Sequence, residues 1–500
     1  IQEHFDPGVR NTPGGPLFGV QFSQLSCSDF NTVASTIPGG TNAGPHRSPL
    51  GFSADSGGLP LYKNGVLAGG IGVMSKNTYS FDANILDIDD DDDEVIAIAG
   101  ATGYDPPPQI TADNIAINGI SLRYTDATSA NLAVPVAAVG SFTPLAVSNY
   151  FAGPTAGHTA IAGLTYGSTD GLSGVAPDGT FGPVLYPGTS TPAYVFTDGA
   201  GTVLDTPTAG TAPAGTAITA AEAQALITSS LNVAYQTRAA IRIPTNSFAQ
   251  VTVTIVDLDG NVLAQARTPD APIFGADVSR QKARTAVFFS RTDAAAKISG
   301  ITATSPSTSD GTFANYITRS QTLVGPTVFS DGIAWSEVAL GDIARPFYPD
   351  GIDADPPGSL SLPFPNWSVF STGLQVDLVA RDILNGTANP PPSQGCAYNS
   401  GTELPLNSKG KTQLANGMQI FSGSAPIYRG NILVGGIGVS GDGIQQDSLI
   451  SYLGAQNGPP TLNNAPAAIR ADQLAPDGVH LRYVNCPAAP FINSSVQNPC

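Results

Sequence analysis

The alternation of apolar and polar residues predicts helices and paired strands in the second half of the chain. Thr219 and Glu222 form a capping box, in which the threonine side chain caps a backbone N–H and the glutamate reaches back. The apolar residues that follow recur on one side of a helix that ends near residue 238. Alternating residues at 251–256 predict a strand, and a second strand returns antiparallel at 262–267 after a tight turn.

The same half of the chain contains two more predicted helices and a second hairpin. Asp277 caps a helix that runs through Ser290, a hairpin covers 426–439, and another helix follows at about 445–453. Residues 299–422 show no clear periodicity and are predicted as a long irregular stretch. The pattern therefore predicts an α+β fold, in which an antiparallel sheet is flanked by helices.

The hairpin sequence occurs twice. Residues 59–73 have the sequence Leu-Pro-Leu-Tyr-Lys-Asn-Gly-Val-Leu-Ala-Gly-Gly-Ile-Gly-Val, and residues 425–439 have the sequence Ala-Pro-Ile-Tyr-Arg-Gly-Asn-Ile-Leu-Val-Gly-Gly-Ile-Gly-Val. A Leu-Arg-Tyr triplet follows each copy, at 122–124 and at 481–483. Because order and direction are preserved, we expect two repeats of a whole domain.

The first repeat lacks the elements that open the second one. It contains an irregular stretch (1–56), the hairpin and a helix at about 93–100, without a counterpart of the capped helix or of the first strand pair. We therefore expect its N-terminal half to have been cleaved away or to come from a separate polypeptide. The unpaired sheet edge would be completed by the protein's own cleaved N-terminal fragment or by a neighbouring subunit, through strand addition. An oligomer is expected.

These features divide the chain into four predicted parts. The first is the C-terminal half of one repeat, the second is a linker or extra layer rich in Ala, Gly, Thr and Pro, the third is a complete repeat and the last is a tail bracketed by cysteines. Their ranges are 1–126, 127–217, 218–485 and 486–500.

Composition and charge indicate a protein that works outside the cytoplasm. Only 12% of the residues are charged, which is about half the usual share, and the 56 Gly and 42 Pro indicate many loops. The formal charge of −18 disfavours nucleic acid and anionic membranes as partners and attracts divalent cations. No apolar run approaches the ~20 residues of a membrane span. We expect an extracellular, cell-surface or periplasmic location.

Four scattered cysteines fit the same location. Cys27, Cys396, Cys486 and Cys500 lack metal-ligand spacing, and two disulfides can pair them in three ways. Cys486 and Cys500 bracket a proline-rich tail, so a bond between them or to Cys396 would hold the C-terminus in place. Four free buried thiols are the alternative.

Three segments together resemble the GlcG/HbpS-like family, which includes the C-terminal domain of PduO-type proteins. They are the strand pair at 251–267, the run Asp-Ala-Pro-Ile-Phe-Gly-Ala-Asp-Val-Ser-Arg-Gln-Lys-Ala-Arg-Thr-Ala at 270–286, and the Gly-Gly-Ile-Gly-Val hairpin. The resemblance implies a five-stranded antiparallel sheet flanked by helices, and assembly into oligomers. It also implies heme binding or heme degradation as an activity of some members.

The histidines do not follow the pattern that heme binding has in this family. In members that bind heme, a histidine on or near the first helix ligates the iron, whereas the predicted helix at 219–238 contains none. The four histidines of the chain lie outside the family's motifs, at His4, His46, His158 and His480.

The resemblance implies a ligand cleft beside the helix at 277–290. Lys282 and Arg284 lie two positions apart and point to different faces of this helix, and Arg284 could bind a carboxylate through both ends of its guanidinium. A surface pair with buried alkyl stems is the alternative. Gly436 and Gly438 belong to a dinucleotide-like glycine pattern within a hairpin strand, which favours close packing of a helix on the sheet over a nucleotide site. Asp277 completes this candidate set.

A run of acidic residues precedes the helix of the first repeat. One interpretation is a solvated acidic cap, in which the negative charges stabilise the N-terminus of the helix through the helix dipole. The second interpretation is a site in which these oxygen ligands hold Ca²⁺. The candidate calcium ligands are Asp87, Asp89, Asp90, Asp91, Asp92, Asp93 and Glu94.

The sequence contains no evident catalytic constellation. We therefore expect an exported cell-surface or extracellular binding and assembly protein. A heme-binding or heme-degrading protein is one alternative, and an enzyme that acts on a small carboxylate near Arg284 is the other.

Overall fold

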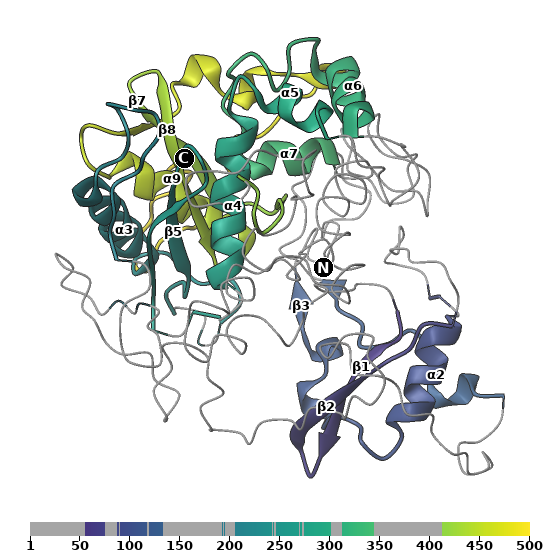
Figure 1. Ribbon diagram of the computed structural model, residues 1–500. Helices are drawn as coiled ribbons and strands as arrows, with labels where there is room; N and C mark the ends of the chain where they lie inside the picture. Colours follow the sequence, from purple (N-terminus) through teal and green to yellow (C-terminus); the bar gives the residue numbers. More distant parts are fainter. Residues whose placement is uncertain are drawn as a thin grey trace, which may run out of the picture.

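The protein is an α+β structure with antiparallel sheets, as the sequence predicts (Figure 1). In the computed structural model, the residues within 56–133 form a first unit and those within 193–500 form a second unit. The described residues are 56–75, 88–89, 91–117, 120–133, 193, 195, 206–242, 244, 247–269, 271–272, 275–301, 313–344 and 413–500.

The second unit is built on a five-stranded antiparallel sheet, which confirms the sheet implied by the family resemblance. The strands lie in the order β6-β5-β8-β7-β9, so the two hairpins meet where β5 pairs with β8. The strands are β5 (Thr252–Asp257), β6 (Val262–Arg267), β7 (Ser424–Arg429), β8 (Ile432–Ser440) and β9 (Asn463–Asn464).

Helices cover both faces of this sheet (Figure 1). Successive side chains of β5 point to opposite faces of the sheet. Val253 and Ile255 join the core under α3 and α9, whereas the hydroxyl of Thr254 contacts that of Ser279 in α4 on the other face. The predicted capping box of Thr219 and Glu222 is present at the start of α3. The helices of these two layers are α3 (Ala220–Ala234), α4 (Gly275–Phe289) and α9 (Ile444–Gln456).

The stretch predicted as irregular at 299–422 contains two helices. They pack with the short helix before them around Phe329 and Trp335, and form a second core beyond α4. The prediction is therefore wrong for this part of the stretch, and residues 302–312 and 345–412 lie outside the described residues. The three helices are α5 (Ala294–Ser299), α6 (Phe313–Val324) and α7 (Glu337–Ala344).

Segments predicted as linker and tail contact the second unit. Thr208 donates its backbone N–H to the carbonyl of Leu263, at the edge of the sheet. Residues 490–492 bond to residues 236–238 beyond the end of α3. Three 3-10 helices precede the tail: η9 (Ala467–Ile469), η10 (Ala471–Gln473) and η11 (Pro476–Gly478).

The first unit consists of a hairpin and a helix with a small core. Among the described residues, three apolar side chains form its buried cluster: Leu59, Ala97 and Ala101. A two-stranded hairpin is marginally stable by itself and depends on apolar packing for its stability. The buried cluster that supplies this packing is small. Its elements are β1 (Gly58–Lys63), β2 (Val66–Gly72), α2 (Asp92–Ala101), η3 (Pro108–Ile110), η4 (Ala112–Asn114), β3 (Ala116–Ile117), β4 (Ile120–Ser121) and η5 (Ser129–Asn131).

The two hairpins share register and irregularity. In β1 and β2 the register shifts between Leu61 and Tyr62, and in β7 and β8 it shifts between Ile427 and Tyr428. An equivalent backbone hydrogen bond follows a 3-10 turn in each unit. The N–H of Leu122 donates to the carbonyl of Ile115 in the first unit, and the N–H of Leu481 donates to the carbonyl of Leu474 in the second. The described part of the chain has no helix long and apolar enough to cross a membrane.

Candidate functional site

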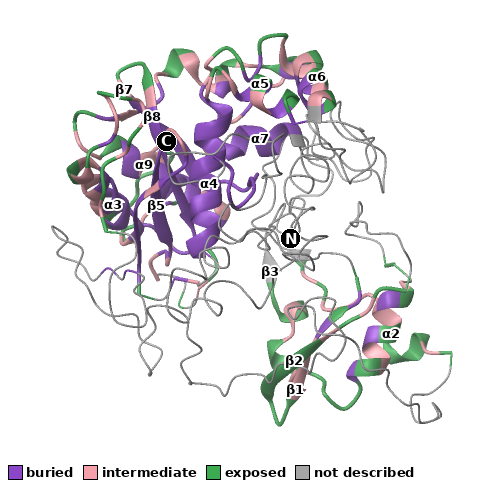
Figure 2. Cartoon of the chain, viewed as in Figure 1, coloured by how far each residue is buried: buried purple, intermediate pink, exposed green. Residues whose placement is uncertain are grey.

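Helix α4, which carries the candidate cleft residues, is buried along its whole length (Figure 2). Lys282 is 1% exposed, and its Nζ donates to the carbonyl of Val439 at 2.8 Å and to Oδ2 of Asp447 at 2.9 Å. The lysine thus joins α4 to β8 and α9. Burial raises the pKa of Asp447 to about 6, although the Lys282 ammonium opposes that rise.

A second buried carboxyl lies in the same region. Glu337, in the first turn of α7, is fully buried and accepts a hydrogen bond from the hydroxyl of Ser424 on β7. Burial raises the pKa of Glu337 to about 8, so its protonated form is favoured at neutral pH.

Arg284 is bound by the protein itself. Its Nε donates to the carbonyl of Gly260 at 2.8 Å, and its Nη1 donates to Oδ1 of Asn416 at 2.7 Å. The carbonyl of Asp277, one turn into α4, accepts from Nδ2 of the same asparagine at 3.0 Å. Lys282 and Arg284 point in different directions, as expected, but both lie inside the protein instead of forming a surface pair.

The glycines of β8 bring the sheet and α4 into close contact. A Cβ atom at Gly436 would lie 2.8 Å from the carbonyl oxygen of Ala283, and one at Gly438 would lie 2.0 Å from that of Ser279. This confirms the packing role predicted for these glycines. The structure brings the five candidate cleft residues to one helix and the strand beneath it, and fills the space between them with its own backbone and side chains.

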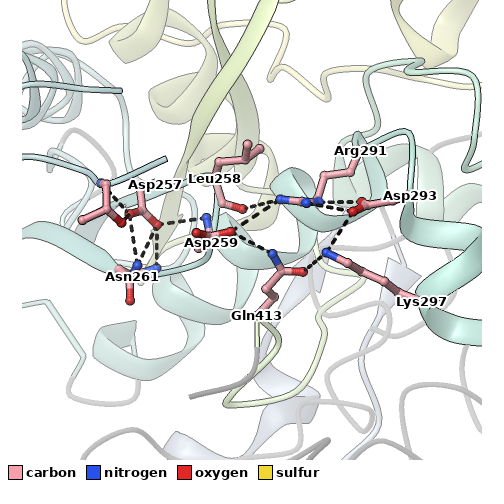
Figure 3. A network of polar contacts seen from close by, with 9 residues as sticks. Asp257, Leu258, Asp259, Asn261, Arg291, Asp293, Lys297 and Gln413 are labelled. Carbon is pink, nitrogen blue, oxygen red and sulfur yellow. Dashed lines mark hydrogen bonds and ion pairs between the residues drawn. The ribbon is translucent and has the colours of Figure 1, made fainter. Parts of the chain in front are cut away.

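A polar network fastens the turn between β5 and β6 to the helices after α4 (Figure 3). Arg291 donates to the carbonyl of Leu258 and pairs with Asp293, whose pKa its hydrogen bond lowers to about 2. Lys297 pairs with Asp293 and donates to Oε1 of Gln413. Nε2 of Gln413 donates to Oδ1 of Asp259 in the turn. Because these groups bind one another, the network is structural.

Asp91, Asp93 and Glu94, at the start of α2, accept hydrogen bonds from separate backbone groups. Asp91 caps the helix through the N–H groups of Asp93 and Glu94, and Asp93 accepts from the N–H of Ser75 at 2.5 Å. Glu94 accepts from the N–H groups of 126 and 127, and burial raises its pKa. The described residues contain no group of three or more potential metal ligands. Asp87 and Asp90 lie outside the described residues.

The disulfide expected in the tail is present, between Cys486 and Cys500. Cys27 and Cys396 lie outside the described residues, as do His4, His46 and His158.

The two hairpins differ in what covers their glycines. In the second unit, the opposite edge of β8 pairs with β5, and a Cβ atom at Gly435 would lie 2.3 Å from the carbonyl oxygen of Val256. In the first unit, no described strand pairs with the opposite edge of β2. A Cβ atom at Gly69 or Gly72 would meet no described atom within 4 Å, and β2 is exposed almost throughout (Figure 2).

Sequence reasoning missed a glycine that precedes each hairpin. Gly57 and Gly423 both adopt positive φ, +106° and +137°, and each lies beside a buried aspartate, Asp93 or Asp447. Each glycine lies two residues before the matched hairpin sequence, and this equal spacing was the signal available in the sequence. The reason for a glycine at position 423 is the nearby Lys282, which is far away in the sequence.

Comparison with known proteins places the family match in the second unit. The family model described as "Haem degrading protein HbpS-like" matches residues 218–328. No curated protein matches the chain. Among solved structures, a PduOC–heme complex is 15% identical, with 50% of this chain and 99% of that chain covered and a TM-score of 0.23. The Klebsiella pneumoniae protein ORFY is 16% identical, with 50% and 94% covered and a TM-score of 0.21. TM-scores this low support no comparison of individual residues. The chain thus contains an HbpS-like segment at residues 218–328, which confirms the family resemblance predicted from its sequence.

Proposed function

We propose that the protein is a binding and assembly protein whose first hairpin accepts a strand and a helix from another polypeptide. One observation carries the proposal: the glycines of β8 are covered by β5 and α4, whereas Gly69 and Gly72 of β2 meet no described atom. An open strand edge next to a glycine face is the geometry that strand addition uses.

The second unit indicates what the incoming elements resemble. A strand like β5 would pair with β2 from Gly69 onward, because β5 pairs with β8 from Gly435 to Ser440, and a helix like α4 would lie across the glycine face.

We also infer that the protein works outside the cytoplasm. The Cys486–Cys500 disulfide supports this location, because such bonds persist in oxidising compartments. The low charged fraction of 12% is a second supporting feature.

A heme-binding or heme-degrading function remains the alternative, because the matching family model is described as "Haem degrading protein HbpS-like". Iron in heme takes an axial His, Cys, Met or Tyr. The open groove along α3, of about 480 Å³, is lined by Ala, Gln, Thr, Ser, Asn, Gly and Pro residues. This groove therefore contains no side chain of a type that ligates heme iron axially. His480, the one described histidine, is exposed and follows η11, with its Nδ1 2.8 Å from the carbonyl oxygen of Asp472.

Gly72→Ala tests the assembly function. The methyl group has room in the hairpin itself, but in the complex it would occupy the position that the α4 backbone takes at Gly438 in the second unit. We expect the complex of the full chain, purified from its native host, to weaken about 5- to 150-fold, because overpacking typically costs ~1–3 kcal/mol. Native mass spectrometry measures the remaining complex.

Gly58→Ala is the matched control. Gly58 also has no described atom within 4 Å of its Cβ position, and its counterpart Ser424 already carries a side chain in a complete repeat. This variant should keep the complex. A wild-type chain without any bound polypeptide, or equal binding by the two variants, contradicts the proposal.

A further inference from the structure

We propose that the first unit binds a helix of a separate polypeptide on a face formed by Lys63, Ile96 and Gly100. The helix would begin with a capping box whose glutamate pairs with Lys63, and it would place a small residue on Gly100. The inference rests on the proposed function, because it adds a second helix to the strand and helix that the open hairpin accepts.

The second unit contains this contact in its complete form. Arg429, the last residue of β7, donates to both carboxylate oxygens of Glu222, at 2.9 and 2.8 Å. Glu222 belongs to the capping box at the start of α3. Further along α3, Ser230 lies against α9, where a Cβ atom at Gly454 would be 2.8 Å from the Cβ of the serine. Helix α3 is therefore held by an ion pair at its start and by a close helix crossing further along.

The apolar part of the same contact is Ile450 of α9. It is fully buried and belongs to the same core cluster as Leu226 and Leu231 of α3. Ile450 and Gly454 are four positions apart, so they lie on the same side of α9, one turn from each other. This is therefore the side of α9 that α3 covers.

In the first unit, the first strand of the hairpin ends in a lysine. Lys63 is the last residue of β1 and occupies the position of Arg429 in the matched sequences. It is exposed, and its side chain has no hydrogen bond or ion pair with another described residue. A cation is thus present at the place where the second unit binds the start of α3.

Helix α2 carries the other two residues of the face. Ile96 and Gly100 have the same spacing as the isoleucine and the glycine of α9, and each isoleucine lies three positions after a buried aspartate. Ile96 is 47% exposed and Gly100 is exposed, whereas their counterparts in α9 are buried. The side of the helix that α3 covers in the second unit is thus exposed in the first.

Helix α2 starts at the same place on its hairpin as α9 does. A Cβ atom at Gly57 would lie 2.9 Å from the Cβ of Asp93, and one at Gly423 would lie 2.9 Å from the Cβ of Asp447. A first-turn carboxylate and a residue eight positions later are about 12 Å apart along a helix axis. One helix can therefore reach the lysine of β1 and the glycine of α2 together, as α3 reaches their counterparts.

One side chain must move when a helix docks. Outside α2 itself, the described atom nearest to the Cβ position of Gly100 is Cδ1 of Ile71 on β2, whereas at Gly454 it is Oγ of Ser230. A change of rotamer would move this atom, and such changes are common at interfaces. Ile71 is half-buried, whereas its counterpart Ile437 lies fully buried in the core under α3 and α9. Docking would thus bury Ile71 as well.

The second unit also defines the sequence of the partner helix. A capping box at Thr219 and Glu222 begins α3, Leu226 follows the glutamate by four positions, and Ser230 follows it by eight. The partner segment should therefore have the pattern Ser/Thr-x-x-Glu-x-x-x-apolar-x-x-x-small. A glutamate also suits the first turn because its charge interacts favourably with the helix dipole. A second copy of this chain is a poorer source, because its own α3 is buried against its own α9.

The test uses the full chain purified from its native host together with its bound polypeptide. A carbodiimide joins a lysine amine directly to a carboxylate that contacts it, and mass spectrometry identifies the two residues. We expect Lys63 to be joined to the first-turn glutamate of a partner segment with this pattern. Lys63→Arg should keep the complex, because the second unit has arginine at this position, and should lose the cross-link.

Affinity measurements test the face separately. Lys63→Gln should weaken the complex about 1.5- to 5-fold, which is the range for an exposed ion pair. Ile96→Ala should weaken it about 3- to 10-fold, because the exposed half of the isoleucine would no longer be buried by the partner. Ile241→Ala is the matched control and should bind as the wild type does, since Ile241 is 50% exposed in the second unit. Amide exchange in α2 checks that each variant is folded.

The outcomes separate this helix from the assembly function. A Lys63 cross-link to a segment of another pattern, or to none, overturns the helix assignment, and so does equal affinity of the Ile96 and Ile241 variants. In either case, a complex that Gly72→Ala still weakens leaves the assembly function standing. A bound polypeptide that is only a second copy of this chain overturns the assigned source. Absence of any bound polypeptide overturns the proposed function itself.

Discussion

The role of individual glycines in this protein depends on which elements pack against them. The Gly-Gly-Ile-Gly segments of β2 and β8 have the same residues and the same register with their hairpin partners, yet one is exposed and the other is buried. In β8 the absence of a side chain lets the backbone of α4 approach the sheet. In β2 the same absence leaves an open face.

A pair of equivalent substitutions makes this difference measurable. In Gly438→Ala the new methyl group would lie 2.0 Å from the carbonyl oxygen of Ser279, so we expect the second unit to lose about 3 kcal/mol of stability. In Gly72→Ala the methyl group meets no described atom, so the unbound first unit should change by less than about 0.5 kcal/mol. Denaturant unfolding of each variant measures both values. Similar losses at the two positions would show that the glycines have similar surroundings.

At the scale of elements, local patterns predicted structure well where burial follows the period of the element. The helix with the Thr219 capping box and the strand at 251–256 lie within a few residues of their predicted positions, because their alternation reflects one buried face. Helix α7 was missed because its buried face includes Glu337, whose partner Ser424 is 87 residues away. Lys282 was predicted to line a cleft or to form a surface pair, and its buried partner Asp447 could not be foreseen because it is 165 residues away.

The start of α3 combines capping with an ion pair that can be separated by mutation. Arg429 donates to both oxygens of Glu222 and lowers the pKa of this carboxyl to about 2. The folded state therefore holds the proton more weakly than the unfolded state, so the pair stabilises above pH ~4.5 and its contribution is lost as the pH falls toward 2.

Glu222→Gln keeps a capping-box side chain and removes the ion pair. At pH 7 we expect a loss of about 1 kcal/mol, which is the upper range for exposed pairs, and at pH 2 the variant should match the wild type. Glu222→Ala removes both interactions and should remain less stable at either pH. Unfolding by denaturant at the two pH values tests this, and a loss in Glu222→Gln that persists at pH 2 would exclude the ion pair as its cause.

At the scale of the whole molecule, the two units differ in the size of their described cores. The second unit closes its sheet between two helical layers and builds extensive cores. The described core of the first unit has three buried apolar side chains, with five partly buried ones packed against them. A polypeptide that binds only the folded first unit would stabilise that unit by mass action, by ~2.7 kcal/mol at a concentration 100 times the Kd.

Hydrogen exchange can locate this stabilisation. With bound polypeptide at 100 times the Kd, we expect amides of β2 and α2 to exchange about 100-fold more slowly than in the chain alone, because local opening would then require dissociation. Amides of α4 and β8 already lie within a closed sheet and helix layer, so their rates should not change. The Gly72→Ala variant is the control that should abolish the slowing in β2. Slower exchange in α4 instead of β2 would place the partner on the second unit and contradict the assignment of the open hairpin as the docking face.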